Sequence, residues 1–162
     1  DLVRFDGIDF LSVPTAIEES GEIKLEKTIQ IISLFEDSRD VLWVGTRAGL
    51  RWYDREQEVL RALEAVDTES FVSRSSINAL AETATGELLI ATYSGLFVLS
   101  SDALELKRAE SESPLQGILL GGVHDILVRG NDIWLGLDGG LSHFNWQTKL
   151  CSYIFLTPKT PT

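Results

Sequence analysis

The sequence predicts an all-β fold. Its 162 residues contain three copies of one pattern, and each copy consists of short strands separated by turns rich in Gly, Asp or Asn. No stretch shows the apolar spacing of an amphipathic helix. One strand of each copy is continuously apolar, which is typical of a strand buried on both faces. Four-stranded antiparallel sheets acquire two buried faces when they stack around an axis, so these observations predict a β-propeller.

The copies stay in register over most of their length. The first, IISLFEDSRDVLWVGTRAGLRWYD from Ile31 to Asp54, aligns without a gap with Ile77 to Ser100, a period of about 46 residues. The third, from Val123 to Asn145, needs one deletion in its first turn. A partial copy opens the chain, because LVRFDG at 2–7 matches LRWYD at 50–54. We therefore expect about three full blades plus two strands of another, a partial or fragment propeller.

The expected organisation is a single β-propeller segment over 1–162. Its parts are a partial blade at 1–13, a connection at 14–28 that contains the charged run EESGEIKLEK, and full blades at 29–64, 76–108 and 122–156. The strands of the first full blade are expected near 29–35, 41–46, 49–54 and 58–64. The turns of the first hairpins lie at 37–40, 85–86 and 130–131, and those of the second hairpins at 48–49, 94–95 and 139–140.

The second strand of each full copy combines bulky apolar residues with one small residue. Gly45, Ala91 and Gly136 occupy the same position in the three copies, as expected where strands crowd together. Trp43 precedes this position in the first copy and is predicted to pack between blades. Its replacement by alanine is therefore expected to cost about 3–5 kcal/mol and to unfold the chain.

The composition argues against several classes of partner. Lys and Arg number 14 against 25 Asp and Glu, a net charge of −11, so we expect no nucleic-acid partner.

No run approaches the ~18 apolar residues of a membrane-spanning helix, and DLVRFDGIDF at the amino end has no signal-peptide pattern, so the segment is not expected to insert in a membrane. The sequence contains no Met, not even an initiator, which suggests a piece of a longer protein. The single Cys151 excludes an internal disulfide and is expected to pack as a small hydrophobic residue.

No combination of residues predicts catalysis. His124 and His143 have no Cys partner at zinc-site spacing, so both are expected to be structural or exposed. The sequence lacks the GxSxG, HExxH and phosphate-loop motifs. Five aspartates at predicted strand ends are expected to accept hydrogen bonds from the local backbone: Asp37, Asp40, Asp54, Asp132 and Asp138. We expect no catalytic residue, no metal and no cofactor.

The candidate ligand-binding residues lie on one rim of the predicted ring. In this blade order the turn between the second and third strands shares a face with the connections between blades, and that turn carries Arg47, Tyr93 and Asp138 at equivalent places. A cation, an aromatic ring and an anion suit a small polar ligand such as an oligosaccharide or a peptide. Phe71 and Arg74, in the connection near 64–76, are further candidates. The alternative is that surface turns vary freely without any function.

The repeated residues resemble the two-component regulator propeller repeat. In the first copy they are the turn Glu36-Asp37, the run LWVGT at 42–46, Gly49-Leu50 and Tyr53-Asp54. The second copy departs from this pattern with Leu89 in place of Trp and Ala91 in place of Gly, and the third with Leu137 in place of Thr. The substitutes are apolar or small, so they leave the fold prediction intact.

This resemblance implies a function. Such propellers form the periplasmic, or otherwise extracytoplasmic, sensor region of bacterial histidine kinases, hybrid kinases and some diguanylate cyclases. The resemblance therefore implies a non-catalytic input module, with a membrane span and a kinase or cyclase output domain elsewhere in the full protein. A protein-interaction scaffold is the alternative, and a propeller hydrolase or lyase is a third candidate. Because a partial ring leaves an apolar blade face at each end, we expect self-association or packing against remaining blades of the same chain.

Overall fold

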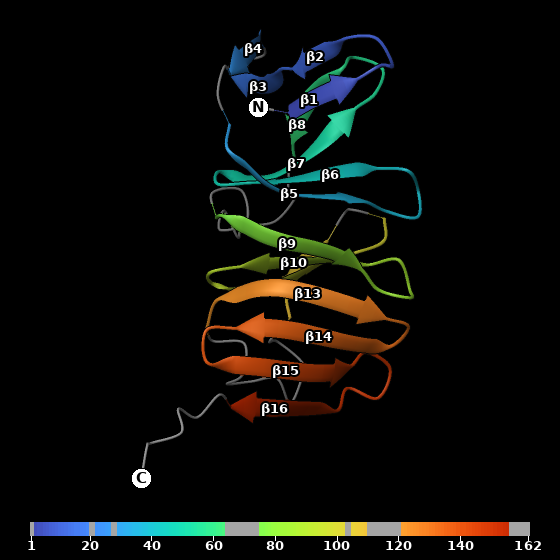
Figure 1. Ribbon diagram of the computed structural model, residues 1–162, viewed down its shortest axis with the longest axis vertical. Helices are drawn as coiled ribbons and strands as arrows, with labels where there is room; N and C mark the ends of the chain where they lie inside the picture. Colours follow the sequence, from blue (N-terminus) through green and yellow to red (C-terminus); the bar gives the residue numbers. More distant parts are fainter. Residues whose placement is uncertain are drawn as a thin grey trace.

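The computed structural model describes residues 2–19, 22–26, 29–63, 75–102, 105–109 and 121–155. These residues form β-strands, and none of them forms a helix. The strands form sheets that follow one another along the long axis of the molecule (Figure 1).

Three groups of four consecutive antiparallel strands form the blades. Blade 1 contains β5 (Ile31–Glu36), β6 (Leu42–Thr46), β7 (Gly49–Asp54) and β8 (Val59–Ala62). Blade 2 contains β9 (Ile77–Glu82), β10 (Leu88–Thr92), β11 (Gly95–Leu99) and β12 (Leu106–Arg108). Blade 3 contains β13 (Val123–Arg129), β14 (Asp132–Leu137), β15 (Gly140–Asn145) and β16 (Cys151–Phe155). The predicted fold class, an all-β partial propeller of four-stranded antiparallel blades, is confirmed.

The amino-terminal strands add to this frame in two ways. β1 (Leu2–Phe5) and β2 (Phe10–Val13) pair as the expected two-stranded unit. β3 (Thr15–Glu19) and β4 (Glu22–Glu26) form a hairpin where the sequence predicted a connection, and β3 joins β8 so that the sheet of blade 1 has six strands. The prediction missed this hairpin because its charged residues were taken for solvated loop, although they alternate with apolar ones as strand residues do.

Apolar side chains fill the spaces between neighbouring sheets. The inner strands β5, β9 and β13 lie side by side, as Figure 1 shows. The core between blades 1 and 2 is formed by Trp43, Leu50, Ile77, Leu80, Leu88, Ile90, Phe97 and Leu99. The core between blades 2 and 3 is formed by Ala79, Leu89, Ala91, Leu96, Val123, Ile133, Leu135 and Phe144. A third core contains Val13 of β2 and Val44, Tyr53 and Leu60 of blade 1.

Strand β10 is buried on both faces, as its continuous apolar sequence predicted. All five of its residues are buried. Leu88 and Ile90 belong to the core shared with blade 1, whereas Leu89 and Ala91 belong to the core shared with blade 3. Successive side chains of a strand point to opposite faces, so a strand between two cores needs apolar residues at every position.

Trp43 lies between blades 1 and 2, which confirms its predicted packing role. Its side chain is 3% exposed, and its indole Nε1 donates a hydrogen bond to Asp37 Oδ2 at 3.0 Å. Asp37 is itself buried and also accepts from the amide of Val41 at 2.9 Å and from the guanidinium of Arg39 at 2.7 Å. Burial alone raises the pKa of Asp37, but the hydrogen bonds from Trp43, Val41 and Arg39 outweigh it and hold the pKa below its usual range.

The small residue of the second strand is required in blade 1. A Cβ atom on Gly45 would lie 2.1 Å from Ser33 Oγ and 2.9 Å from Ile77 Cγ2, so only glycine fits between the strand and blade 2. At the equivalent Gly136 the nearest atom would be Asp125 Cβ at 3.6 Å, an ordinary contact. The predicted crowding is therefore confirmed at Gly45 and is absent at Gly136.

The turn aspartates and the cysteine behave largely as expected. Asp54 accepts from the amides of Glu56 and Gln57 at 3.0 and 3.1 Å. Asp132 instead accepts from the side chain of Asn145 at 3.2 Å and contacts His143 Nε2 at 2.9 Å. Cys151 is half-buried against the core between blades 2 and 3, which confirms its expected packing.

Candidate functional site

The turns that carry the candidate residues lie on one side of the stacked blades. They are the β6–β7, β10–β11 and β14–β15 turns, on the left in Figure 1. Arg47, Tyr93 and Asp138 each hold the first position of one of these turns. We call this side the rim. The common placement follows from the repeat, because equivalent turns of stacked blades project in the same direction.

Two of these turns are held by a threonine that precedes the candidate residue. Thr46 Oγ1 donates to the carbonyl of Gly49 at 2.7 Å and accepts from the amide of Ala48 at 3.0 Å. Thr92 Oγ1 makes the same two bonds in blade 2, at 2.9 and 3.1 Å. Gly49 and Gly95 adopt φ values of 101° and 128°, which glycine tolerates best. The side chains of Arg47 and Tyr93 are therefore not needed to form their turns.

Tyr93, His124 and Asp138 form a chain of contacts from blade 2 to blade 3. The rings of Tyr93 and His124 meet edge to face, with centroids 5.5 Å apart and planes at 75°. His124 Nε2 lies 2.5 Å from Asp138 Oδ1, and the amide of Gly122 donates to Asp138 Oδ2 at 3.1 Å. Both carboxylate oxygens of Asp138 are thus engaged inside the protein.

The same contacts explain the lowered pKa of Asp138. The hydrogen bond from His124 is the main cause, followed by that from the Gly122 amide, and both lower the pKa of Asp138 because they stabilise its charged form. The side chains are 66% exposed for Asp138 and 41% exposed for His124, so solvent screens this pair. Its effect is mainly to orient the imidazole.

Arg47 and Tyr93 line a cavity on the rim between blades 1 and 2. Its volume is about 510 Å³, within the range of small-molecule sites. The lining residues are Gln30, Ile31, Ile32, Arg47, Ser76, Asn78 and Tyr93. Among the described lining residues Arg47 is the charged one, and none of them is a carboxylate. The side chain of Asn78 is held in place because its Nδ2 donates a hydrogen bond to the carbonyl of Val123 at 2.8 Å.

The structure therefore divides the predicted site residues. Arg47 and Tyr93 share the cavity, whereas Asp138 reaches Tyr93 only through His124. Phe71 and Arg74 lie outside the described residues.

Sequence reasoning did not place His124 among the rim candidates; it was expected to be structural or exposed, and it is exposed. The signal was present in the repeat, since Ile32, Asn78 and His124 occupy one position in the three copies, next to the start of each inner strand. Two of these three residues line the cavity, and the third contacts Tyr93.

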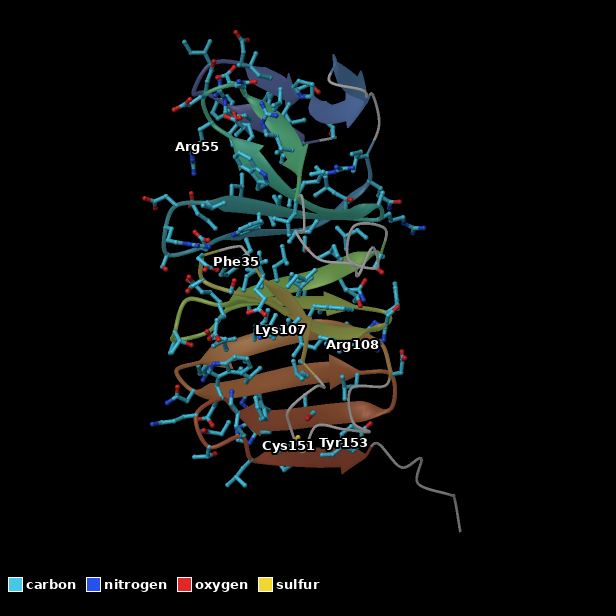
Figure 2. All side chains as sticks on the ribbon, turned by 180° about the vertical axis from the view of Figure 1, so that it is seen from behind. Phe35, Arg55, Lys107, Arg108, Cys151 and Tyr153 are labelled. Atoms are coloured by element: carbon cyan, nitrogen blue, oxygen red, sulfur yellow. The ribbon has the colours of Figure 1, made fainter. Side chains whose placement is uncertain are left out.

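The outer strands of blades 2 and 3 support the rim turns. Figure 2 shows Arg108 and Tyr153 on these strands. Arg108 donates to the carbonyl of Ser94 in the β10–β11 turn, and its guanidinium lies 5.7 Å from the centre of the Phe97 ring. A Cβ atom on Gly139, in the β14–β15 turn, would lie 3.0 Å from the Tyr153 hydroxyl. The rim thus rests on a rigid scaffold, as binding loops commonly do.

The described residues show no cluster of metal ligands and no histidine paired with a nucleophile. Across the described ranges, no three His, Cys, Asp or Glu residues are placed to hold a metal ion. His124 and His143 each bond to an aspartate, and in the described part of the chain neither bonds to a Ser, Thr or Cys side chain. No helix in the same residues is long and apolar enough to cross a membrane.

Fold and rim together define a repeat-built propeller segment with a cavity between blades 1 and 2. Comparison with known families agrees: residues 26–48 match the family described as two component regulator propeller, which confirms the resemblance seen in the sequence. A search of curated proteins found no matching sequence.

Solved structures show the same fold. The extracellular domain of a putative one-component system from B. thetaiotaomicron superposes with a TM-score of 0.63 at 19% identity, over 78% of this chain and 16% of that one. The extracellular domain of a putative hybrid two-component system from the same organism gives a TM-score of 0.58 at 18% identity, over 96% of this chain and 24% of that one. A puromycin hydrolase gives a TM-score of 0.55 at 14% identity, over 87% and 23%. The chain thus spans less than a quarter of the length of each of these structures.

Proposed function

We propose that this chain is a non-catalytic sensor module, part of the extracytoplasmic input region of a two-component signalling receptor. Two observations support the proposal: the match of residues 26–48 to the two component regulator propeller family, and the likeness in fold to extracellular domains of signalling systems. A kinase or cyclase output domain would then lie elsewhere in the full protein. Fold alone never fixes function, so the proposal also needs a site.

The single observation that carries the binding role is the cavity on the rim. It combines an exposed cation, an exposed aromatic ring and amide and hydroxyl groups, on turns whose backbone is fixed by other residues. Such a set binds small polar ligands, because stacking supplies contact area while polar groups fix orientation. We infer that the ligand is a small polar molecule such as an oligosaccharide or a peptide, and that its binding changes how propellers pack in a dimeric receptor.

A binding screen tests this proposal. Glycan and peptide libraries are offered to the wild type and to Arg47→Ala, Tyr93→Ala and Asp138→Ala. Arg55→Ala is the matched control: this exposed arginine follows β7 and pairs with Glu36, away from the cavity (Figure 2). We expect a ligand whose binding weakens in the three rim variants and persists in the control. Unchanged binding in all three eliminates the rim assignment.

Two other functions make different predictions. A protein-interaction scaffold would bind folded partners over a surface much wider than the cavity, so single rim substitutions would change its affinity little. A propeller hydrolase is suggested by the likeness to puromycin hydrolase. It would need a nucleophile beside a base, and neither described histidine bonds to one. Absence of hydrolysis of amide and ester substrates by the purified chain distinguishes the sensor from this alternative.

A further inference from the structure

We propose that the rim cavity binds a ring compound that carries a carboxylate, with Arg47 pairing the carboxylate and Tyr93 packing against the ring. This inference rests on the proposed function and specifies the class of ligand. A sugar acid and a carboxylate-bearing peptide both have this chemistry.

The state of Arg47 is the first reason. Four other arginines of this acidic chain pair with nearby carboxylates: Arg4 with Glu58, Arg39 with Asp37, Arg55 with Glu36 and Arg61 with Asp54. Arg47 is exposed, and within the described residues its guanidinium forms no ion pair and no hydrogen bond. It lines a cavity whose described lining residues include no carboxylate. A guanidinium presents a planar fork of donors that matches a carboxylate with two parallel hydrogen bonds.

The position of Tyr93 is the second reason. Its side chain is 62% exposed, yet neighbours from blade 3 fix the ring. His124 meets the ring edge to face, and a Cβ atom on Gly122 would lie 3.4 Å from Tyr93 Cδ1. An aromatic side chain that is already held in place loses little conformational entropy when a ring stacks on it. Arg47 and Tyr93 therefore provide the charge contact and the ring contact of one ligand.

Asp138 has a different role from the one its charge suggests. Both of its oxygens are engaged, by His124 Nε2 and by the amide of Gly122. It therefore acts as a positioning residue that holds His124 against Tyr93, and it does not pair with the ligand. Ser76 and Asn78, whose side chains bond each other at 3.4 Å, add polar atoms to the same lining.

The test uses two matched pairs of probes and calorimetric titration of the 162-residue chain. Methyl glucuronide against methyl glucoside represents the sugar source, and N-acetylphenylalanine against its amide represents the peptide source. We expect at least one acid to bind at least about tenfold more tightly than its neutral partner. That preference should disappear in Arg47→Gln, persist in part in Arg47→Lys and remain intact in the control Arg55→Gln.

The variants also distinguish the residues that position the aromatic ring from the arginine that pairs with the carboxylate. Tyr93→Ala and Asp138→Ala should weaken acid and neutral probes by the same factor, leaving the acid-to-neutral ratio unchanged, because they remove or misplace the ring contact. Asp138→Asn keeps acceptor and donor groups at this place and should retain more affinity than Asp138→Ala. Thermal midpoints equal to that of the wild type show that the loss is local.

The outcomes distinguish this inference from the proposed function. Equal binding of acid and neutral probes, or an acid preference that survives in Arg47→Gln, overturns the carboxylate inference and leaves a rim site for neutral ligands. Failure of both acids to bind at 10 mM, about the weakest affinity that calorimetry resolves, overturns it as well. The library screen then decides the proposed function by itself.

Discussion

Blades 2 and 3 share one repeat but differ in how much of it is buried. In blade 2 all five residues of β10 are buried, whereas in β14 of blade 3 only Ile133 and Leu135 are. Leu96 of blade 2 is 1% exposed and its counterpart Leu141 in blade 3 is 36% exposed. The difference arises because a neighbouring blade covers both faces of blade 2, while no described strand covers the far face of blade 3. The repeat pattern thus encodes the ability to form a core, and the neighbouring sheet decides whether a core forms.

The largest expected contrast is between two equivalent tryptophans. Trp43→Ala should destabilise the chain by about 3–5 kcal/mol, because Trp43 is 3% exposed between two blades. Trp134→Ala should cost no more than about 1 kcal/mol, because Trp134 is half-buried and stacks mainly on His143, with ring centroids 4.3 Å apart. Urea denaturation measures both changes. Equal losses in the two variants would show that the far face of blade 3 is covered in solution.

The next contrast concerns the turn that precedes the second strand. Asp37→Ala should cost about 1–3 kcal/mol, because it leaves the indole of Trp43 and the amide of Val41 without their acceptor. At the equivalent position of blade 2, Thr83 bonds the amides of Thr85 and Glu87 with a neutral hydroxyl. The group that accepts from the turn amides is therefore a carboxylate in blade 1 and a hydroxyl in blade 2.

That charge gives the stability of blade 1 a dependence on pH. The folded-state pKa of Asp37 lies below its unfolded value of 3.8. Its contribution is therefore fully present above pH values near 3.8 and is lost as the pH falls through the lower folded-state pKa. Asp37→Asn should flatten the loss of stability on acidification, which a series of urea titrations between neutral pH and pH 3 measures.

A smaller contrast lies between two glycines. Gly45→Ala should cost about 1–3 kcal/mol, because the added Cβ would overlap Ser33 and Ile77. Gly136→Ala should change stability by less than about 0.5 kcal/mol, since its Cβ would meet only ordinary contacts. Thermal unfolding of the two variants measures the difference. A similar loss at both positions would contradict the idea that Ser33 and Ile77 make Gly45 the more crowded position.

The smallest expected effect on stability comes from the far face of blade 3. Leu127, Leu141 and Ile154 expose apolar surface there, at positions that equivalent blades cover with another blade. We therefore expect copies of the chain to associate through this face, and Leu141→Glu should weaken association while changing stability by less than about 0.5 kcal/mol. Sedimentation velocity over a range of concentrations measures the association. A wild-type chain that stays monomeric at all concentrations contradicts this prediction.

The parts of the fold that repeat were predictable from the sequence, and the parts that do not repeat were not. Strand β6 was expected at 41–46 and is found at Leu42–Thr46, because the same pattern recurs in three copies and reveals its turns. The β3–β4 hairpin has no second copy, and its charged residues concealed its alternation. A pattern that occurs once cannot be checked against a second copy in the same chain.

The candidate site was predictable only in outline. Blade order alone places residues 47, 93 and 138 on one rim, and the structure places their turns there. The pairing of Arg47 with Tyr93 at one cavity depends on how blades 1 and 2 pack against each other, and the contact of His124 with Tyr93 depends on blades 2 and 3. The sequence of a single repeat does not show which of its residues will contact the neighbouring blade.

The threonine-held turns have a consequence for how such a rim can change over generations. Thr46 and Thr92 hold the backbone, so the next residue can be exchanged without disturbing the blade. A single codon change at 47 or 93 would then change the chemistry of the rim while the protein still folds. Blade 3 lacks this freedom: Leu137 replaces the threonine, and the Asp138 side chain itself bonds to its surroundings. The residues of the rim should therefore vary first at the turns of blades 1 and 2.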